Sequence, residues 1–287
     1  MLLEHDNGAR AMAAEALGEL HDERAIEPLV AALRDDDQDV ASKAAFGLAA
    51  LGELGGRRLL DSLQDHDGRV RGWAVTALTA AAVDGTFEGN RAIVPLQPLL
   101  HDPDVDVQRA AVQALRLLGD WTSMPTPLRP DAYTAAVYTD HGQFYFCDGQ
   151  FDGDVADDSD LDWPNRWLST GPRTFIRVST TTPSGAVPVA IEVMDGPLEN
   201  GFDGWEHVEE ISLDVPSGRI ACRTLFGYKW GEPAELMAPM GTYRVRLYAN
   251  TTAMGVYGFG YGDYYRFVLW PAPYEAPLVL RSNPEGM

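Results

Sequence analysis

The densest group of side chains capable of chemistry is an acidic stretch between residues 148 and 162. Its aspartates are Asp148, Asp152, Asp154, Asp157, Asp158, Asp160 and Asp162. Oxygen ligands at alternate positions suit a hard cation, so one interpretation is a calcium site, although the EF-hand order with its glycine and terminal glutamate is absent. A second is an acidic loop that imitates phosphate spacing and occupies the basic groove of a nuclease. A third is a solvated loop.

Aromatic side chains alternate with glycines at Tyr257, Phe259 and Tyr261. Tyrosine suits a recognition loop because it offers a large contact area at a small cost in rotamer freedom. The glycine spacing does not indicate a phosphate-binding loop, because no helix is predicted after it. We expect either a partner-binding loop or a hairpin tip whose rings cover a β-rich domain.

Polar and aromatic side chains also gather at Trp205, His207, Glu209 and Glu210, where a strand begins that either rims a pocket or lies on the surface. Signatures of known catalytic sites are absent. There is no Gly-x-Ser-x-Gly elbow, His-Glu-x-x-His pair, Cys-x-x-Cys pair or Walker-type loop. We therefore predict a protein that is not an enzyme and uses no cofactor.

The formal net charge of the 287 residues is -21. Such a surface repels phosphate backbones, which argues against direct binding of nucleic acid. It favours a basic protein partner, and a nuclease is one such protein. The alternative is that the acidity only aids solubility.

Cys147 and Cys222 lie in apolar, strand-like stretches, where we expect buried thiols in a reducing compartment; a single disulfide in a secreted protein is the alternative. The first residues show neither a basic region nor an apolar signal core, and no stretch approaches 18 apolar residues. These features predict a soluble, cytoplasmic protein without a membrane partner.

Internal repetition organises the first 120 residues. A small residue followed by leucine recurs after 31, 30 and 37 residues, at Ala16-Leu17, Gly47-Leu48, Ala77-Leu78 and Ala114-Leu115. Acidic clusters recur after 30 and 37 residues, at Asp35-Asp36-Asp37, Asp65-His66-Asp67 and Asp102-Pro103-Asp104. Because both landmarks keep one register, we predict an array of stacked units.

Each unit is predicted to form two helices. The first is rich in alanine, which lets neighbouring helices approach closely, and the second is short and amphipathic, as over Ala25–Leu33 and Ala92–Leu100. The aspartates after the second helix are expected to cap the next one, because a carboxylate accepts the free amide hydrogens of a first helical turn.

This pattern, over about residues 8–120, resembles the HEAT-like repeats of the phycobilisome-lyase type. The resemblance implies an α-solenoid that presents an extended surface to a protein partner. Deoxyhypusine hydroxylases have a similar array and bind two irons through His-Glu pairs near the start of the first helices. The equivalent positions here supply no such pair, and we expect no metal there: Arg10-Ala11, Ala41-Ser42, Arg71-Gly72 and Gln108-Arg109.

After a stretch with three prolines, Trp121–Pro130, the pattern changes to short alternating runs. One face of Thr242–Tyr248 is predicted to carry Tyr243, Val245 and Leu247, and the other Arg244 and Arg246. Similar faces recur along the runs 187–193, 211–215 and 265–269. Roughly eight strands separated by glycine- and proline-containing loops predict an antiparallel β-sandwich.

The order of the apolar motifs adds a second resemblance, over about residues 132–275. Gln143-Phe144 is expected to close an early strand, Val187-Pro188-Val189 and Ile211–Val215 follow, and Met240–Val245 leads into an aromatic strand, Tyr264–Pro271. This order is similar to the ComJ-like family, named after a competence-associated inhibitor of a DNA-entry nuclease. The sequence departs from the pattern in a longer acidic loop and an extra hairpin around Gly218–Pro239.

Together these observations predict an α+β multidomain chain. Residues 1–120 form an α-solenoid of HEAT-like helical repeats, 121–131 a proline-rich linker, and 132–287 an antiparallel β-sandwich, the ComJ-like domain. The leading hypothesis is an acidic binding protein that regulates a basic protein, with inhibition of or immunity to a nuclease as its most specific form. The alternatives are an adaptor that joins two proteins, one per domain, and a β-sandwich that binds calcium or another ligand.

Overall fold

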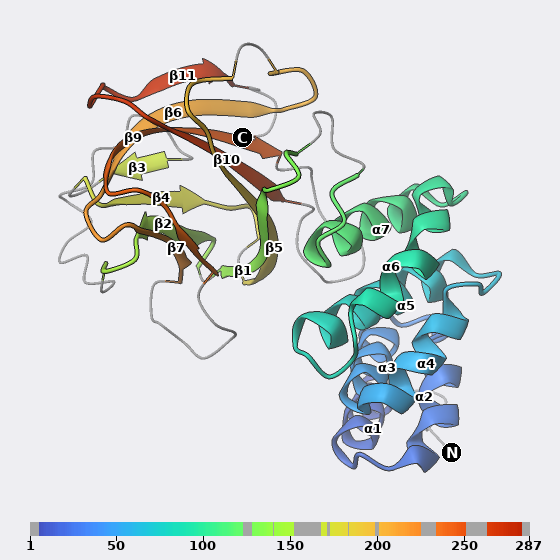
Figure 1. Cartoon of the computed structure of the whole chain (residues 1–287). Helices are drawn as coiled ribbons and strands as arrows, with labels where there is room; N and C mark the ends of the chain where they lie inside the picture. The colour runs from blue at the N-terminus through green and yellow to red at the C-terminus, as the bar shows by residue number, and fades with distance from the viewer. Residues whose placement is uncertain are drawn as a thin grey trace. The chain divides into compact units, whose positions relative to one another are not determined.

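A computed structural model shows a helical first part and a β-rich second part (Figure 1). The described residues divide into two compact units, one ending at Asp120 and the other beginning at Trp121. We name them the helical unit and the β unit and describe each by itself. The structure describes residues 6–122, 128–139, 141–151, 168–170, 173–182, 184–198, 201–224, 234–250 and 263–282.

The helical unit alternates longer and shorter helices in chain order. They are α1 (Asn7–Glu19), η1 (Glu23–Ala25), α2 (Ile26–Ala32), α3 (Gln38–Ala50), α4 (Gly52–Ser62), α5 (Gly68–Val83), α6 (Asn90–Leu96), η2 (Gln97–His101) and α7 (Val105–Leu117), where η is a 3-10 helix. The first helix of each repeat begins after an aspartate whose side chain accepts a backbone amide hydrogen. These caps are Asp6, Asp37, Asp67 and Asp104, so the predicted capping is confirmed.

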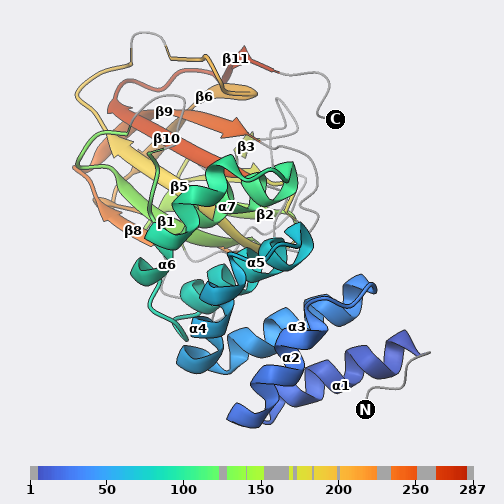
Figure 2. The same cartoon turned by 90° about the vertical axis from the view of Figure 1, so that its right-hand side faces the viewer.

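Successive first helices pack side by side, α1 against α3, α3 against α5 and α5 against α7, as Figure 2 shows. Alanine and leucine side chains fill one core between them. Gly18 and Gly47 mark a close approach, because a Cβ atom added at Gly18 would lie 2.5 Å from the Cα atom of Gly47. The small residues of the repeat thus set the spacing between helices.

The second helices match the prediction in part: α2 is one continuous α-helix within the predicted range 25–33, whereas the predicted range 92–100 is divided between two helix types. A 3-10 turn precedes α2, and α6 gives way to the 3-10 helix η2. Pro98 lies at the start of η2 and has no amide hydrogen to donate to the helical ladder, which explains the change of helix type.

The β unit contains eleven described strands in two sheets. The strands are β1 (Tyr133–Thr139), β2 (Gln143–Asp148), β3 (Leu168–Thr170), β4 (Phe175–Ser179), β5 (Gly185–Val193), β6 (His207–Val215), β7 (Arg219–Arg223), β8 (Ala234–Met237), β9 (Gly241–Asn250), β10 (Tyr264–Pro271) and β11 (Leu278–Arg281). One sheet has the order β1-β5-β10-β9-β6-β11, and the other β3-β4-β2-β7-β8.

A shared apolar core contains side chains from both sheets. The ring of Phe146 on β2 stacks on that of Phe267 on β10, with centroids 4.1 Å apart. Tyr243, Val245 and Leu247 belong to this core, while the intervening arginines lie on the opposite face, as predicted.

Three features of the β unit differ from the expectations. The described strands number more than eight, and one pairing, β5 with β10, is parallel. Gln143 begins β2 instead of closing a strand. The extra hairpin is present as the antiparallel pair β7 and β8, which follows a turn at Gly218, where the positive φ of 72° favours glycine.

Cys147 and Cys222 are both buried and free, so the disulfide alternative is wrong. They lie on adjacent strands, but Cys222 pairs with Phe146 in the register and Cys147 with Ala221, which sends the two thiols to opposite faces. Trp121, predicted to open the linker, is buried in an aromatic cluster of the β unit. No helix within the described ranges combines the length and the apolar character that a membrane crossing requires.

Candidate functional site

The turns before α3, α5 and α7 repeat one arrangement of aspartates, which we name the aspartate edge: Asp35, Asp36, Asp37, Asp65, Asp67, Asp102 and Asp104. In each turn the first aspartate accepts a hydrogen bond from the backbone amide of the third, at 2.9 Å, 3.0 Å and 2.9 Å. The third aspartate then caps the helix. Two carboxylates per turn therefore shape the backbone at the helix N-terminus.

An arginine from earlier in the chain pairs with the first aspartate of each turn. Arg10 on α1 lies 2.8 Å from Asp35, and Arg71 on α5 lies 2.6 Å from Asp102. Arg34 forms the corresponding pair with Asp65. These ion pairs join each repeat to the turn of the next.

Arg10 on α1 and Arg71 on α5 occupy equivalent positions in their repeats. Both arginines follow their capping aspartate by four residues, so the helix directs them toward the next turn. At the equivalent position of α3, the short side chain of Ala41 cannot reach Asp65. Arg34 supplies the positive charge beside Asp65 instead. Gln108 on α7 donates a hydrogen bond of 2.5 Å to the carbonyl oxygen of Asp102.

Two carboxyl groups of the aspartate edge that pair with arginines have lowered pKa values. The hydrogen bond from Arg10 lowers the pKa of Asp35. Burial raises the pKa of Asp102, but the hydrogen bonds from Arg71 and the Asp104 amide outweigh it, so the pKa lies below its ordinary value. Asp36 is fully exposed, 3.5 Å from Arg69, and Asp39 is also exposed. The carboxylates of Asp36 in the edge and of Asp39 beside it therefore face solvent.

Of the acidic segment predicted from the sequence, only Asp148 lies among the described residues. It is buried at the end of β2. One carboxylate oxygen accepts from the amide of Gln150 at 3.0 Å, and the other from the amide and hydroxyl of Ser217 at 2.9 Å and 2.6 Å. Asp148 therefore fixes two turns of the β unit. The remaining predicted residues lie outside the described ranges: Asp152, Asp154, Asp157, Asp158, Asp160, Asp162, Tyr257, Phe259 and Tyr261.

The group at the start of β6 is not a surface strand, because Trp205, His207, Glu209 and Glu210 are all buried. Strand β6 lies between β9 and β11, and both of its faces are covered. The strand alternation separates the two carboxyl groups: Glu209 shares the inner face with the apolar core, whereas Glu210 lies on the outer face opposite Arg246.

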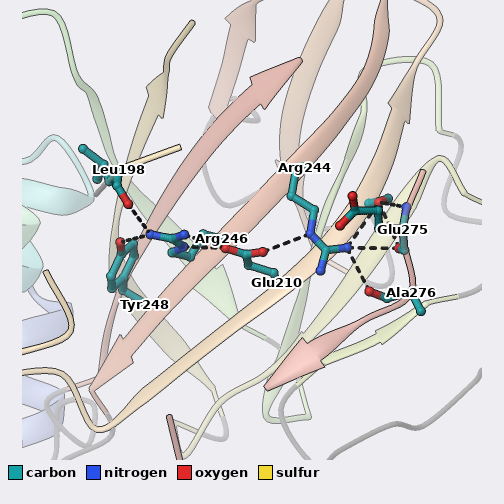
Figure 3. Close-up of polar contacts among 8 residues, drawn as sticks. Leu198, Glu210, Arg244, Arg246, Tyr248, Glu275 and Ala276 are labelled. Carbon is teal, nitrogen blue, oxygen red and sulfur yellow. Dashed lines mark hydrogen bonds and ion pairs between the residues drawn. The ribbon is translucent and has the colours of Figure 1, made fainter. Parts of the chain in front are cut away.

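On the outer face, Glu210 lies between two arginines of β9 (Figure 3). Its carboxylate is 2.7 Å from Arg246 and 3.2 Å from Arg244. Arg246 also donates to the carbonyl oxygen of Leu198, and Arg244 to those of Glu275 and Ala276. The network ties the loops after β5 and β10 to the sheet.

A second buried pair joins β5 and β10 on the same face. Arg266 donates to Glu192 at 2.6 Å, and the other oxygen of Glu192 accepts from the amide of Arg129 at 2.7 Å. Buried charges of this kind persist because each has a partner of opposite charge or a hydrogen bond. These contacts have a structural role.

On the inner face, burial alone raises the pKa of Glu209 to about 7. Burial also lowers the pKa of His207, two residues away on the same face of β6. Both effects favour the neutral form of the side chain. The described residues contain no group of three or more His, Cys, Asp or Glu side chains able to hold a metal ion.

Sequence reasoning found the aspartates of the turns but missed their arginine partners. The signal was present, since Arg10 and Arg71 occupy equivalent positions four residues after a cap. The sequence placed Arg244 and Arg246 of β9 on the correct face but did not predict their burial. The segments that cover them come from distant parts of the chain, so the residues around them gave no sign of it.

Comparisons with known proteins agree with the helical architecture. Residues 1–50, which include α1, α2 and α3, match the family model described as HEAT repeats. No curated protein matches the chain. The chain is similar to a solved structure described as "Crocagin biosynthetic gene J", at 13% identity and a TM-score of 0.35, covering 51% of this chain and 100% of that one. It is also similar to an engineered protein, at 24% identity and a TM-score of 0.28, covering 41% and 59%.

Proposed function

We propose that this chain is a non-catalytic binding protein whose acidic surface holds a basic protein, with a nuclease inhibitor or immunity protein as its most specific form. The aspartate edge is the observation that carries the proposal. HEAT-type repeats commonly mediate protein–protein contact, and here their turns repeat one acidic arrangement along the side at which the first helices begin. Asp36 and Asp39 are available to a partner's lysines and arginines.

The finer architecture is part of the same proposal. Side-by-side packing of α1, α3, α5 and α7 supports an α-solenoid of the phycobilisome-lyase type. The shared core of two mainly antiparallel sheets supports a β-sandwich, and the ComJ-like assignment of this domain stays a prediction. Partner contact through the acidic segment 148–162 and the aromatic loop around Tyr257, Phe259 and Tyr261 stays a prediction, as does a cytoplasmic location.

Affinity capture with the tagged full chain tests this function. We expect a basic protein to be retained at about 50 mM salt and released near 500 mM, because screening shortens the reach of surface charges. Asp36→Asn with Asp39→Asn should weaken capture about tenfold, on the order of 1.4 kcal/mol. Asp61→Asn with Glu88→Gln removes two exposed carboxylates elsewhere in the unit and serves as the matched control. Recovery of no basic protein at either salt concentration contradicts the proposal.

An adaptor that joins two proteins is the second candidate. The division into two compact units, each with its own apolar core, favours it. Substitutions in the aspartate edge should then release one partner while a second, bound to the β unit, stays. An inhibitor that uses one combined surface loses its single partner in the same experiment.

A further inference from the structure

Two methionines are exposed at the turn between β8 and β9. Met237 is the last residue of β8 and is 74% exposed, and Met240, directly before β9, is 75% exposed. Ala238 between them is buried in the apolar core of the β unit. Its amide donates to the carbonyl oxygen of Gly218 at 3.0 Å. The two thioethers therefore project from a turn whose backbone is tied to the start of β7.

The turn keeps its shape without help from either thioether. The hydroxyl of Tyr243, whose ring is buried in the core, donates to the carbonyl oxygen of Pro239 at 2.6 Å. Neither Met237 nor Met240 belongs to that core. A change in the polarity of these two side chains therefore leaves the packing between the two sheets as it is.

Arg219 on β7 lies beside Met237. The two residues pair in the antiparallel register, so their side chains stand on the same face of the sheet. This is the outer face, because the adjacent Ile220 and Leu236 pack into the core. The side chain of Arg219 is half-exposed, and its ion pair with Glu235 is long, at 3.7 Å. A guanidinium carries five N–H donors, so Arg219 has donors left for a further acceptor next to Met237.

The other methionines within the described ranges provide two references. Met194 is half-buried, and its sulfur accepts a hydrogen bond from Arg129 at 3.2 Å. Both features keep an oxidant from the lone pairs of the sulfur, because oxidation of a thioether depends on its exposure. Met12 on α1 is 71% exposed and shows the rate of a thioether in contact with water.

We propose that Met237 and Met240 form an oxidant-sensitive site, at which a peroxide converts both thioethers to sulfoxides while the fold persists. The sulfur attacks one oxygen of hydrogen peroxide, so that an S–O bond forms and the O–O bond breaks. The proton of the transferred hydroxyl passes to the departing hydroxide, which leaves as water. The sulfur loses two electrons and the peroxide gains them.

Oxidation replaces an apolar end of the β unit with a polar one. Each sulfoxide oxygen is a hydrogen-bond acceptor that the thioether lacks. At Met237 the new oxygen forms beside Arg219, which donates to it and stabilises the oxidised form. This inference does not depend on the proposed function, since it uses neither the aspartate edge nor a partner.

Treatment of the full chain with hydrogen peroxide at pH 7, followed by proteolysis and mass spectrometry, tests the site. Met237 and Met240 should each gain one oxygen atom at a rate within about threefold of that of Met12, and at least about tenfold faster than Met194. The melting temperature of the chain oxidised at these positions should stay within about 2 °C of that of the reduced chain, as for other changes at exposed positions.

The chain with Met237→Leu and Met240→Leu keeps two apolar side chains of similar volume that a peroxide does not oxidise. On a hydrophobic interaction column, peroxide should make the unsubstituted chain elute earlier. The double variant should lose most of this change, whereas the matched control Met12→Leu should keep most of it. Arg219→Leu should destabilise the oxidised chain more than the reduced one, because only the sulfoxide accepts from Arg219.

Three results overturn the inference. The first is oxidation of Met237 and Met240 no faster than that of Met194. The second is oxidation far slower than that of Met12, which means that another part of the chain covers the turn in solution. The third is an unfolding by peroxide that the double variant escapes, which means that the two thioethers are needed for the fold.

Discussion

Glu209 and Glu210 are neighbours in sequence, yet the strand places their carboxyl groups in opposite electrostatic surroundings. Glu210 lies on the outer face between Arg244 and Arg246. Glu209 points into the core face, opposite Leu247, and burial raises its pKa to about 7. One residue along a strand thus separates a paired carboxylate from a carboxyl group that the fold holds protonated at mildly acidic pH.

This difference predicts a pH dependence of stability. The folded state holds the Glu209 proton up to a pH of about 7, whereas the unfolded chain releases it near the ordinary pKa of 4.5. The folded state therefore binds more protons in that window, and the free energy of unfolding falls as the pH rises through it. Glu209→Gln should be more stable than the unsubstituted chain at pH 8 by up to about 3 kcal/mol, and by little at pH 4.

Chemical denaturation at both pH values measures the difference. The exposed Glu88→Gln substitution is the control, and we expect no change in the pH profile from it. An unchanged profile in Glu209→Gln means that water reaches this carboxyl group in solution.

At the scale of elements, the helical unit depends on the junction between each turn and the helix before it. Arg71 is buried, pairs with Asp102 and donates to the carbonyl oxygens of Asp65 and His66. It therefore links α5 to two turns. Arg69 on the same helix is half-exposed and pairs with Asp67 at 3.2 Å, where solvent screens the interaction.

The two arginines provide a matched pair of substitutions. Arg71→Met leaves the carboxylate of Asp102 buried without its countercharge and should lower the free energy of unfolding by about 3 kcal/mol. Arg69→Met should lower it by less than about 1 kcal/mol. Denaturant titrations followed by circular dichroism at pH 7 compare them, and equal losses would show that the Asp102 pair contributes no more than an exposed one.

At the scale of the whole molecule, the net charge of -21 opposes the compact state through self-repulsion, even though many arginines are paired. Screening by salt weakens both the repulsion among the excess carboxylates and the attraction within the ion pairs. Exposed ion pairs lose attraction in salt, but each contributes less than about 1 kcal/mol, whereas the repulsion sums over all the excess carboxylates. Repulsion should therefore dominate the response to salt.

We expect the melting temperature at pH 7 to rise between about 10 mM and about 150 mM sodium chloride, as the Debye length shortens from about 30 Å to about 8 Å. Near the isoelectric pH of about 4.5 the net charge vanishes and the increase should disappear. Differential scanning fluorimetry at both pH values measures the effect. A melting temperature that falls with salt at pH 7 would assign the larger share to ion pairs.

Local patterns along the chain predict the elements that depend on neighbouring residues. A repeated alanine stripe and a repeated aspartate predict the first helices and their caps, because helix periodicity and capping act within a few residues. The period-2 alternation likewise placed Tyr243, Val245 and Leu247 on one face of β9. The sequence did not predict the 3-10 segments around α2 and α6, or that Gln143 begins a strand, because the propensities of residues define the ends of elements poorly.

The contacts that these elements make depend on long-range packing. The pairing of β5 with β10 is parallel, and the partners of Arg10 and Arg71 lie 25 and 31 residues away. The burial of Glu209 and the exposure of Met12 depend on whether another segment covers them. The residues next to a side chain in the sequence do not show whether a distant segment buries it. Charge pattern and periodicity therefore predicted an acidic surface, while the ion pairs and the burial of its carboxylates came from long-range packing.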